Sequence, residues 1–204
     1  MEKLKKIAED CFEFDKIEKL RYEKVVSFLK KGKLLDIGCR KAYIQNFCKN
    51  EYYGVDFVAE SKKYVKNFYC VDISKEKLPF EDNYFDVVFM GFVLEHISNF
   101  EFTLNECYRV LKKKGRLIVT VPNPYHKTYG LKPTLFGYEN KIKKNQLTEH
   151  IHCFSPDELI NLLNLYGLKL IYLDIMDNNL FSFKLPEWRI FKLFGITILA
   201  VCEK

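Results

Sequence analysis

The feature that most constrains the fold is a series of short apolar runs separated by segments with helical spacing. Each run is nearly continuous in apolar character, as expected for strands covered on both faces. Strands that alternate with helices form a mostly parallel sheet with helices on both sides. The sequence therefore predicts an α/β fold, Rossmann-like and doubly wound, with a mostly parallel seven-stranded sheet. The predicted strands are KLLDIG, YYGVDF, FYCVDI, FDVVFMGF, RLIVTVP, LKLIYLDIM and GITILAVCEK.

The segments between the strands predict the helices and one long loop. Ser155, Pro156 and Glu158 form the pattern of a capped helix start, and Gly167 is placed to end that helix. Residues 123–150 show no periodicity, and such long excursions usually have a function. We expect a single domain over residues 1–204, in which this excursion covers the acceptor and residues 1–31 form an N-terminal helical cap. The predicted helices span residues 3–31, 41–50, 58–67, 99–115 and 155–167.

Composition excludes several classes of protein. No apolar run is long enough to cross a bilayer, and the N-terminus lacks the apolar core of a secretory signal, so we expect a cytoplasmic protein. The seven cysteines show no zinc-like spacing, which argues against a structural metal. The net charge of +6 comes from lysines spread along the chain, which favours a solvated surface over a nucleic-acid groove.

Acidic residues follow three of the predicted strands. Ligands of open parallel sheets bind outside the carboxyl ends of the strands, where Asp36, Asp56 and Asp72 are expected. Asp56 follows Gly38 by 18 residues, close to the separation at which an acid accepts hydrogen bonds from a ribose. A carboxylate suits a vicinal diol because its two oxygens accept in parallel. The pattern predicts a nucleoside-like ligand, with Asp72 near the adenine amino group.

A dinucleotide is the alternative ligand for such a site. Its G-x-G-x-x-G fingerprint needs glycine at position 40 and glycine or alanine at position 43. The chain has Arg40 and Tyr43 there, and the bulky Tyr43 would obstruct a pyrophosphate. NAD is therefore disfavoured.

Five motifs in order resemble the class I S-adenosylmethionine-dependent methyltransferases, in particular the quinone-biosynthesis-like, type 11 branch. LLDIGCRKA resembles the first motif of that family and YYGVDF its ribose-binding motif. CVDISKEKLPFEDNYFDVVFMGFVLEHI, ECYRVLKKKGRLIVTVPNP and HIHCFSPDEL are similar to the three segments that follow. The resemblance covers about residues 34–124 and 150–167. It implies the cofactor S-adenosyl-L-methionine.

The resemblance also implies roles for individual residues. Gly38 and the backbone near Cys39 would lie against the methionine part of the cofactor, Asp56 would bind the ribose, and Asp72 with Ile73 the adenine. Asp36 would support the turn or the amino group, and the residues after the fourth strand would close the site. The full expected cofactor set is Asp36, Gly38, Cys39, Arg40, Asp56, Phe57, Asp72, Ile73, Met90 and Gly91.

Two positions of the first motif depart from the family pattern, because Arg40 and Ala42 stand where glycines are common. Arg40 keeps its backbone amide, and its side chain can point away or meet the methionine carboxylate. Ala42 adds one methyl group at a helix start. Since Gly38 is retained where the backbone must come closest, we expect cofactor binding to persist.

Histidines are the candidate catalytic residues. His96, His126 and His150 could act as a general base or contact the acceptor, although His96 could equally be structural. Some quinone O-methyltransferases bind a divalent metal through a Glu-x-x-Glu-His pattern. Glu95 and His96 match it, but Phe92 replaces the first carboxylate, so we expect no metal.

The resulting prediction is an enzyme that transfers a methyl group from S-adenosyl-L-methionine to a small or medium-sized organic acceptor. Two alternatives stay open at this point. One is a non-catalytic binding or scaffold protein whose glycine loop has degenerated. The other is an RNA methyltransferase, which the positive charge favours and the lack of a separate RNA-binding module disfavours.

Overall fold

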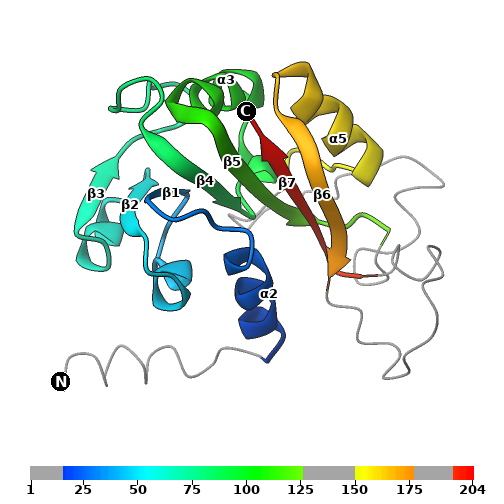
Figure 1. The fold of residues 1–204 in the computed structure, drawn as a ribbon, viewed down its shortest axis with the longest axis horizontal. Coiled ribbons are helices and arrows are strands. Elements are labelled where there is room, and N and C mark those ends of the chain that lie inside the picture. Colours follow the sequence, from blue (N-terminus) through cyan, green and yellow to red (C-terminus); the bar gives the residue numbers. More distant parts are fainter. Residues whose placement is uncertain (1–15, 126–149, 177–194) are drawn as a thin grey trace, which may run out of the picture.

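The computed structural model describes residues 16–125, 150–176 and 195–204, and its centre is a single seven-stranded sheet (Figure 1). The sheet has the order β3-β2-β1-β4-β5-β7-β6, and only β7 runs against its neighbours. This confirms the predicted mostly parallel, Rossmann-like fold. The strands are β1 (Lys33–Ile37), β2 (Glu51–Asp56), β3 (Asn67–Cys70), β4 (Phe85–Gly91), β5 (Leu111–Pro122), β6 (Lys169–Met176) and β7 (Thr197–Glu203).

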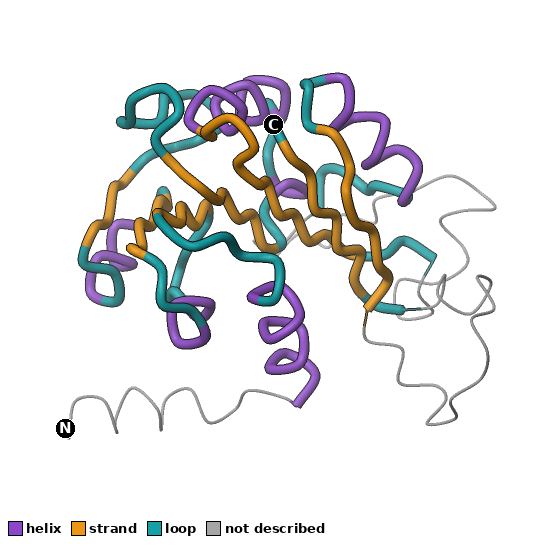
Figure 2. Tube along the Cα trace, in the orientation of Figure 1, coloured by secondary structure: helices purple, strands orange, loops and turns teal. Residues whose placement is uncertain are grey.

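Helices cover both faces of the sheet. Figures 1 and 2 show α3 (Phe100–Val110) and α5 (Pro156–Leu165) on one face and α2 (Lys16–Val26) on the other. The 3-10 helices are η1 (Tyr43–Phe47), η2 (Ala59–Lys63) and η3 (Leu94–His96). Within these described parts of the chain, every helix is too short or too polar to traverse a lipid bilayer.

The continuous apolar runs are explained by the two layers of core on either side of the sheet. Successive side chains of a strand point to opposite faces. In β1, Leu35 packs into the core beneath α3 and α5, whereas Leu34 packs into the core on the α2 side. In β4, Val88 packs into the core beneath α3 and α5, and Val87 packs into the core on the α2 side. Both positions of each pair are therefore apolar.

Two predicted helices are much shorter than expected. The chain forms only the single 3-10 turns η1 and η2 where residues 41–50 and 58–67 were predicted to be helical. Ala42 adopts a left-handed conformation (φ 54°) directly before η1, and Cys48 is already extended after it. The link between β1 and β2 therefore has room for one turn only.

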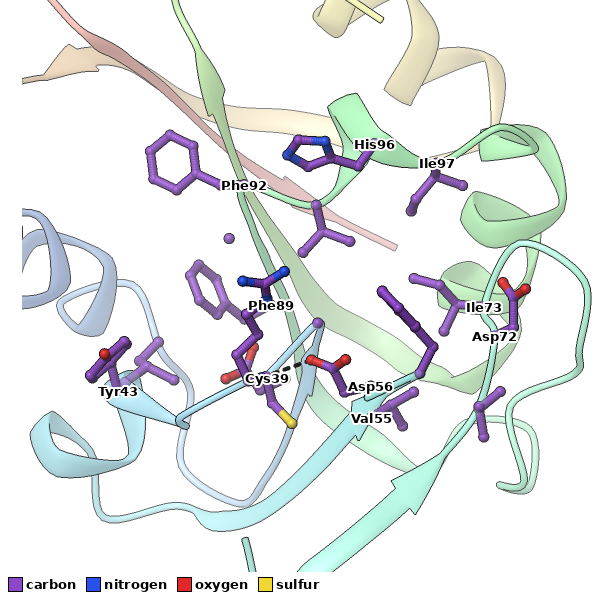
Figure 3. A pocket seen from close by; sticks show the side chains of 18 of the residues that line it. Cys39, Tyr43, Val55, Asp56, Asp72, Ile73, Phe89, Phe92, His96 and Ile97 are labelled. Carbon is purple, nitrogen blue, oxygen red and sulfur yellow. Dashed lines mark hydrogen bonds between the residues drawn. The ribbon is translucent and has the colours of Figure 1, made fainter. Parts of the chain in front are cut away.

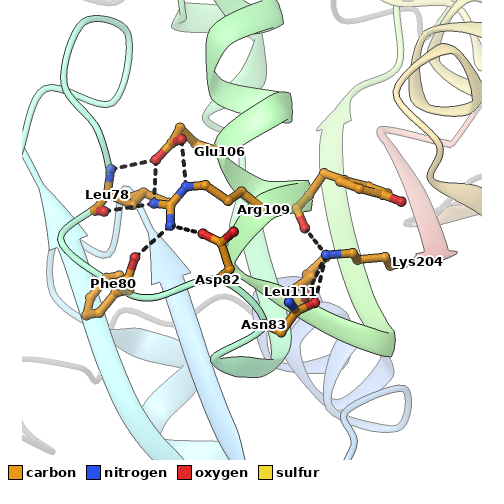
Figure 4. Close-up of polar contacts among 9 residues, drawn as sticks. Leu78, Phe80, Asp82, Asn83, Glu106, Arg109, Leu111 and Lys204 are labelled. Atoms are coloured by element: carbon orange, nitrogen blue, oxygen red, sulfur yellow. Dashed lines mark hydrogen bonds and ion pairs between the residues drawn. The ribbon is translucent and has the colours of Figure 1, made fainter.

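The predicted helix 99–115 also ends early. The structure ends α3 at Val110, and the next residue, Leu111, pairs with Phe85 as the first residue of β5. Lys204 Nζ donates to the carbonyls of Tyr108 (2.7 Å) and Leu111 (2.8 Å), which satisfies groups that a longer helix would have bonded internally (Figure 4). The C-terminal lysine thus stabilises the end of the helix.

Arg109 ties the loop before β4 to α3. Its guanidinium donates to the Leu78 and Phe80 carbonyls and pairs with Glu106 at 2.7 Å and Asp82 at 2.9 Å (Figure 4). Glu106 is buried and also accepts the Leu78 N–H, while the Arg109 guanidinium holds the pKa of Glu106 below its usual range. A planar group with five donors can make all of these bonds at once.

The C-terminal part of the fold, with α5, β6 and β7, agrees closely with the sequence predictions. Ser155 and Glu158 form the predicted capping box of α5, with the Glu158 N–H bonded to the Ser155 hydroxyl. β7 inserts between β5 and β6, so that Thr197 is the register partner of both Pro122 and Met176. The ends of β5 and β6 and the start of β7 therefore lie on one edge of the sheet.

Candidate active site

A pocket of about 620 Å³ opens where β1, β2 and β4 end (Figure 3). Cavities of this size accommodate nucleoside-sized ligands. Nine of the ten expected cofactor residues lie around it. They are Asp36, Gly38, Cys39, Arg40, Asp56, Phe57, Asp72, Ile73 and Gly91.

Met90 is the exception, and its position corrects the sequence expectation. Phe89 and Gly91 line the pocket, and residues alternate across a strand, so the Met90 side chain lies on the opposite face. It is fully buried there, with its sulfur 3.7 Å from the thiol of Cys107 on α3.

The turn after β1 keeps a glycine-like backbone although only one glycine remains. Gly38 has φ 71°, and a Cβ at this position would collide with the side chain of Val93. Arg40 (φ 40°) and Ala42 (φ 54°) also occupy the left-handed region, which is strained for residues with a side chain. The turn thus has a glycine-like backbone at two positions that carry other residues.

Asp56 connects this turn to the end of β2. Its carboxylate is buried and accepts the backbone N–H of Arg40 through Oδ2 and that of Val58 through Oδ1, both at 2.9 Å. Each carboxylate oxygen has a second lone pair. Asp56 also lines the pocket, where Figure 3 shows its carboxylate at the centre. It can therefore hold the turn and still accept two hydroxyl groups.

Asp36 provides a second acidic group beneath the same turn. It is fully buried, and it accepts a hydrogen bond from the hydroxyl of Tyr52. Burial raises the pKa of Asp36 to about 7, with a further contribution from the negative charge of Asp56 and an opposing one from Tyr52. A group that ionises near neutral pH in this position is able to interact with a cationic ligand.

Asp72 stands at the far end of the pocket, beside Ile73 (Figure 3). Its carboxylate accepts from the Ser74 N–H and hydroxyl and from Lys75 Nζ. The Lys75 and Ser74 hydrogen bonds lower the pKa of Asp72. The acid is therefore charged and fixed in one orientation at neutral pH.

Aromatic residues outside the expected cofactor set form the remaining wall. Tyr22 from α2, Tyr43, Phe89 and Phe92 all line the pocket. Tyr22 and Phe89 carried no signal in the sequence, whereas Tyr43 was noted only as an obstacle to a pyrophosphate and Phe92 only as the replacement of a metal-binding carboxylate. Aromatic faces attract cations, which suits a positively charged ligand. The guanidinium of Arg21 already lies 4.8 Å from the centre of the Phe92 ring.

Two of the expected histidines lie together. His96 lines the pocket, and its ring centre is 4.9 Å from that of His150, a contact that the sequence could not reveal. Burial and His96 together lower the pKa of His150. Next to them, burial raises the pKa of Glu95 to about 7. His126 is outside the residues that the structure describes.

Residues 35–119 of the chain match the family model of a methyltransferase domain. Over 61 residues the chain is 41% identical to the ubiquinone/menaquinone biosynthesis C-methyltransferase UbiE of Rhizobium rhizogenes, covering 30% of this chain and 24% of that protein. Over 118 residues it is 36% identical to an uncharacterized protein of Methanocaldococcus jannaschii, covering 52% and 50%. The matched part of the chain thus spans between a quarter and a half of these relatives.

Among solved structures, the fold is similar to a SAM-dependent methyltransferase from Archaeoglobus fulgidus, with a TM-score of 0.67. The sequences are 20% identical, and the alignment covers 91% of this chain and 92% of the other. At this level of identity the likeness concerns the fold, because one fold serves many functions.

Proposed function

We propose that this chain is a class I S-adenosylmethionine-dependent methyltransferase and that it transfers a methyl group from S-adenosyl-L-methionine to a small or medium-sized organic acceptor. The single observation that carries the proposal is the placement of Asp56. Its carboxylate lines the pocket and is bonded to the turn that contains Gly38. A diol-binding acid and a close-approach backbone therefore meet in one site.

The pocket residues divide into parts that suit the parts of the cofactor. We assign the ribose to the two free lone pairs of Asp56, and the adenine to the end of the pocket formed by Asp72 and Ile73. The turn at Gly38 leaves the backbone bare for the methionine part. This division supports a nucleoside joined to an amino acid.

The sulfonium group, which supplies an already activated methyl group, is positively charged. Asp36 and the rings of Tyr22, Phe89 and Phe92 line the same pocket as Gly38. Negative charge and aromatic faces both favour a cation there. The protein's own contribution is then to align the acceptor and exclude water.

We place the acceptor on the side of the pocket formed by Phe92 and His96, with His150 next to His96. His126 belongs to the same proposal through its place in the excursion, which is outside the described residues. Imidazoles at this position can contact an oxygen or nitrogen of the acceptor.

Calorimetric titration of the full chain with S-adenosylhomocysteine tests the proposal without knowledge of the acceptor. We expect one molecule bound per chain, and no comparable binding of NAD because Tyr43 and Arg40 replace the glycines of a dinucleotide site. A chain that binds no S-adenosylhomocysteine at millimolar concentration refutes the proposal and leaves a non-catalytic role on this fold.

A further inference from the structure

The carboxylate of Glu95 is buried without a hydrogen-bond partner. Its residue is 1% exposed, and neither Oε1 nor Oε2 has a partner within the described structure. Burying a carboxylate in this way is unfavourable, and buried polar groups are nearly always bonded to something. A carboxylate left like this, directly before the pocket-lining His96, points to a bound cation.

Two imidazoles lie next to that carboxylate. His96 Nε2 is 3.9 Å from Glu95 Oε1, and the His150 ring contacts the His96 ring at 63°. One potential ligand atom from each of the three residues lies within 4.8 Å of the other two. Zinc bonds of about 2.0–2.2 Å place ligand atoms about 3.5 Å apart, so the side chains need to close by about 1 Å.

The backbone holds the three residues in register. The N–H groups of Ile151 and His152 donate to the Glu95 carbonyl at 2.9 and 3.1 Å. These bonds fix the segment that carries His150 against the 3-10 helix η3, which carries Glu95 and His96. The cluster is therefore positioned by main-chain contacts rather than by the flexible ends of side chains.

We propose that Glu95, His96 and His150 bind a divalent transition-metal ion of the Zn²⁺ type. Two imidazoles and one carboxylate are a donor set that such ions accept, with a fourth position left open. Mg²⁺ prefers oxygen ligands, so the absence of a carboxylate at Phe92 excludes a hard cation but not this one. The expectation of no metal rested on the hard-cation pattern and on the spacing of the cysteines, and neither includes His150, which is remote in sequence.

The open position of the ion would face the acceptor. His96 lines the pocket, so an ion held by it has access to the same space. A divalent ion lowers the pKa of a hydroxyl that coordinates it, which would prepare an oxygen acceptor for methylation. This consequence rests on the proposed function, whereas metal binding itself does not.

Co²⁺ serves as the spectroscopic probe for the test. The full chain is treated with a chelator, dialysed and titrated with Co²⁺ in visible absorption and with Zn²⁺ in calorimetry. We expect one ion per chain, the visible bands of a low-symmetry Co²⁺ site, and no displacement by excess Mg²⁺. Glu95→Gln and His150→Ala should each weaken binding at least tenfold.

His152→Ala is the matched control, because it removes a neighbouring imidazole that does not belong to the cluster. It should bind Co²⁺ as the wild type does. Circular dichroism and S-adenosylhomocysteine binding verify that each variant is folded. The proposal is overturned if the wild type takes up no stoichiometric ion, or if both cluster variants keep full affinity, or if His152→Ala loses as much affinity as they do.

The two proposals fail separately. A chain that binds Co²⁺ at this cluster but no S-adenosylhomocysteine refutes the proposed function and keeps the metal site. A chain that binds S-adenosylhomocysteine but no Co²⁺ keeps the function and removes the metal.

Discussion

The carboxylate of Asp56 accepts the backbone N–H of Arg40 at 2.9 Å, so the acid that ends β2 also fixes the turn that follows β1. Because the bond is to the backbone, it is independent of the side chain at position 40. This relationship explains how the turn adopts a left-handed backbone at Arg40 and Ala42 without glycine.

Asp56→Asn should weaken binding of S-adenosylhomocysteine by about 100-fold or more. The substitution removes the charge and one acceptor oxygen, and hydrogen bonds to charged groups contribute about 1.5–3 kcal/mol each. Calorimetry measures the change. Asp157→Asn, an exposed acid in the first turn of α5, is the control and should bind as the wild type does. Equal affinity of Asp56→Asn and wild type would contradict the assignment of the ribose.

Arg40→Gly should increase the free energy of unfolding by about 0.5–1 kcal/mol. A left-handed conformation costs a non-glycine residue about 1–2 kcal/mol, while glycine adds a smaller cost through the entropy of the unfolded chain. Arg40 is exposed, so little packing is lost. Urea unfolding measures the difference.

Lys41→Gly is the matched control for that gain, because Lys41 is also exposed but does not have a positive φ. It should lower the stability by up to about 1 kcal/mol. If both substitutions destabilise the protein equally, the turn is not strained at position 40.

Asp36 should make the protein less stable as the pH rises. Its pKa is about 7 in the folded protein and lower in the unfolded chain, so between about pH 4 and 7 the folded state holds a proton that the unfolded state has lost. The free energy of unfolding therefore falls as the pH rises through this window. In Asp36→Asn the fall between pH 5 and 8 should be smaller by about 2–3 kcal/mol.

Tyr52→Phe should act in the opposite direction. Removing the hydroxyl that donates to Asp36 takes away an interaction that lowers its pKa, so the loss of stability should continue to higher pH than in the wild type. Urea unfolding at pH 5, 7 and 8 compares the three proteins. Parallel pH profiles for all three would show that Asp36 does not titrate in this range.

Arg109→Ala should destabilise the fold by about 3 kcal/mol, because it leaves the buried Glu106 without its ion pair. Arg109→Lys should fall between this variant and the wild type, since lysine keeps the charge but not the planar fork. Lys113→Ala removes an exposed charge from the same region and should change the stability by less than about 0.5 kcal/mol. Chemical unfolding at pH 7 ranks the variants, and a loss below about 1 kcal/mol for Arg109→Ala would contradict the expectation.

The sheet was predictable from sequence because both faces of its strands are buried, which produces unbroken apolar runs such as that around Leu34 and Leu35. Helix lengths could not be predicted from the sequence, because a helix can be ended by contacts with residues that are distant in the sequence. Lys204 helps to end α3, and η1 lies between the left-handed Ala42 and the extended Cys48. Neither effect leaves a local pattern.

The residues of the proposed cofactor side could be predicted because they lie at strand ends, whose positions the parallel sheet determines. The residues of the proposed acceptor side could not be predicted in this way. His150 approaches His96 only because its segment bonds to the carbonyl of Glu95. Tyr22 reaches the pocket from a helix whose docking no sequence pattern specified, and Met90, expected among the cofactor residues, has its side chain buried on the other face of β4.

Thr197 pairs with both Pro122 and Met176, so the chain departs from β5 and β6 and returns to β7 along one rim. The excursion after β5 comes back at His150, against η3. Insertions anchored at this rim can be exchanged during evolution while β1 and β2, which carry Gly38 and Asp56, stay unaltered. Proteins of this fold can therefore differ in the proposed acceptor side while the proposed nucleoside-binding half stays the same.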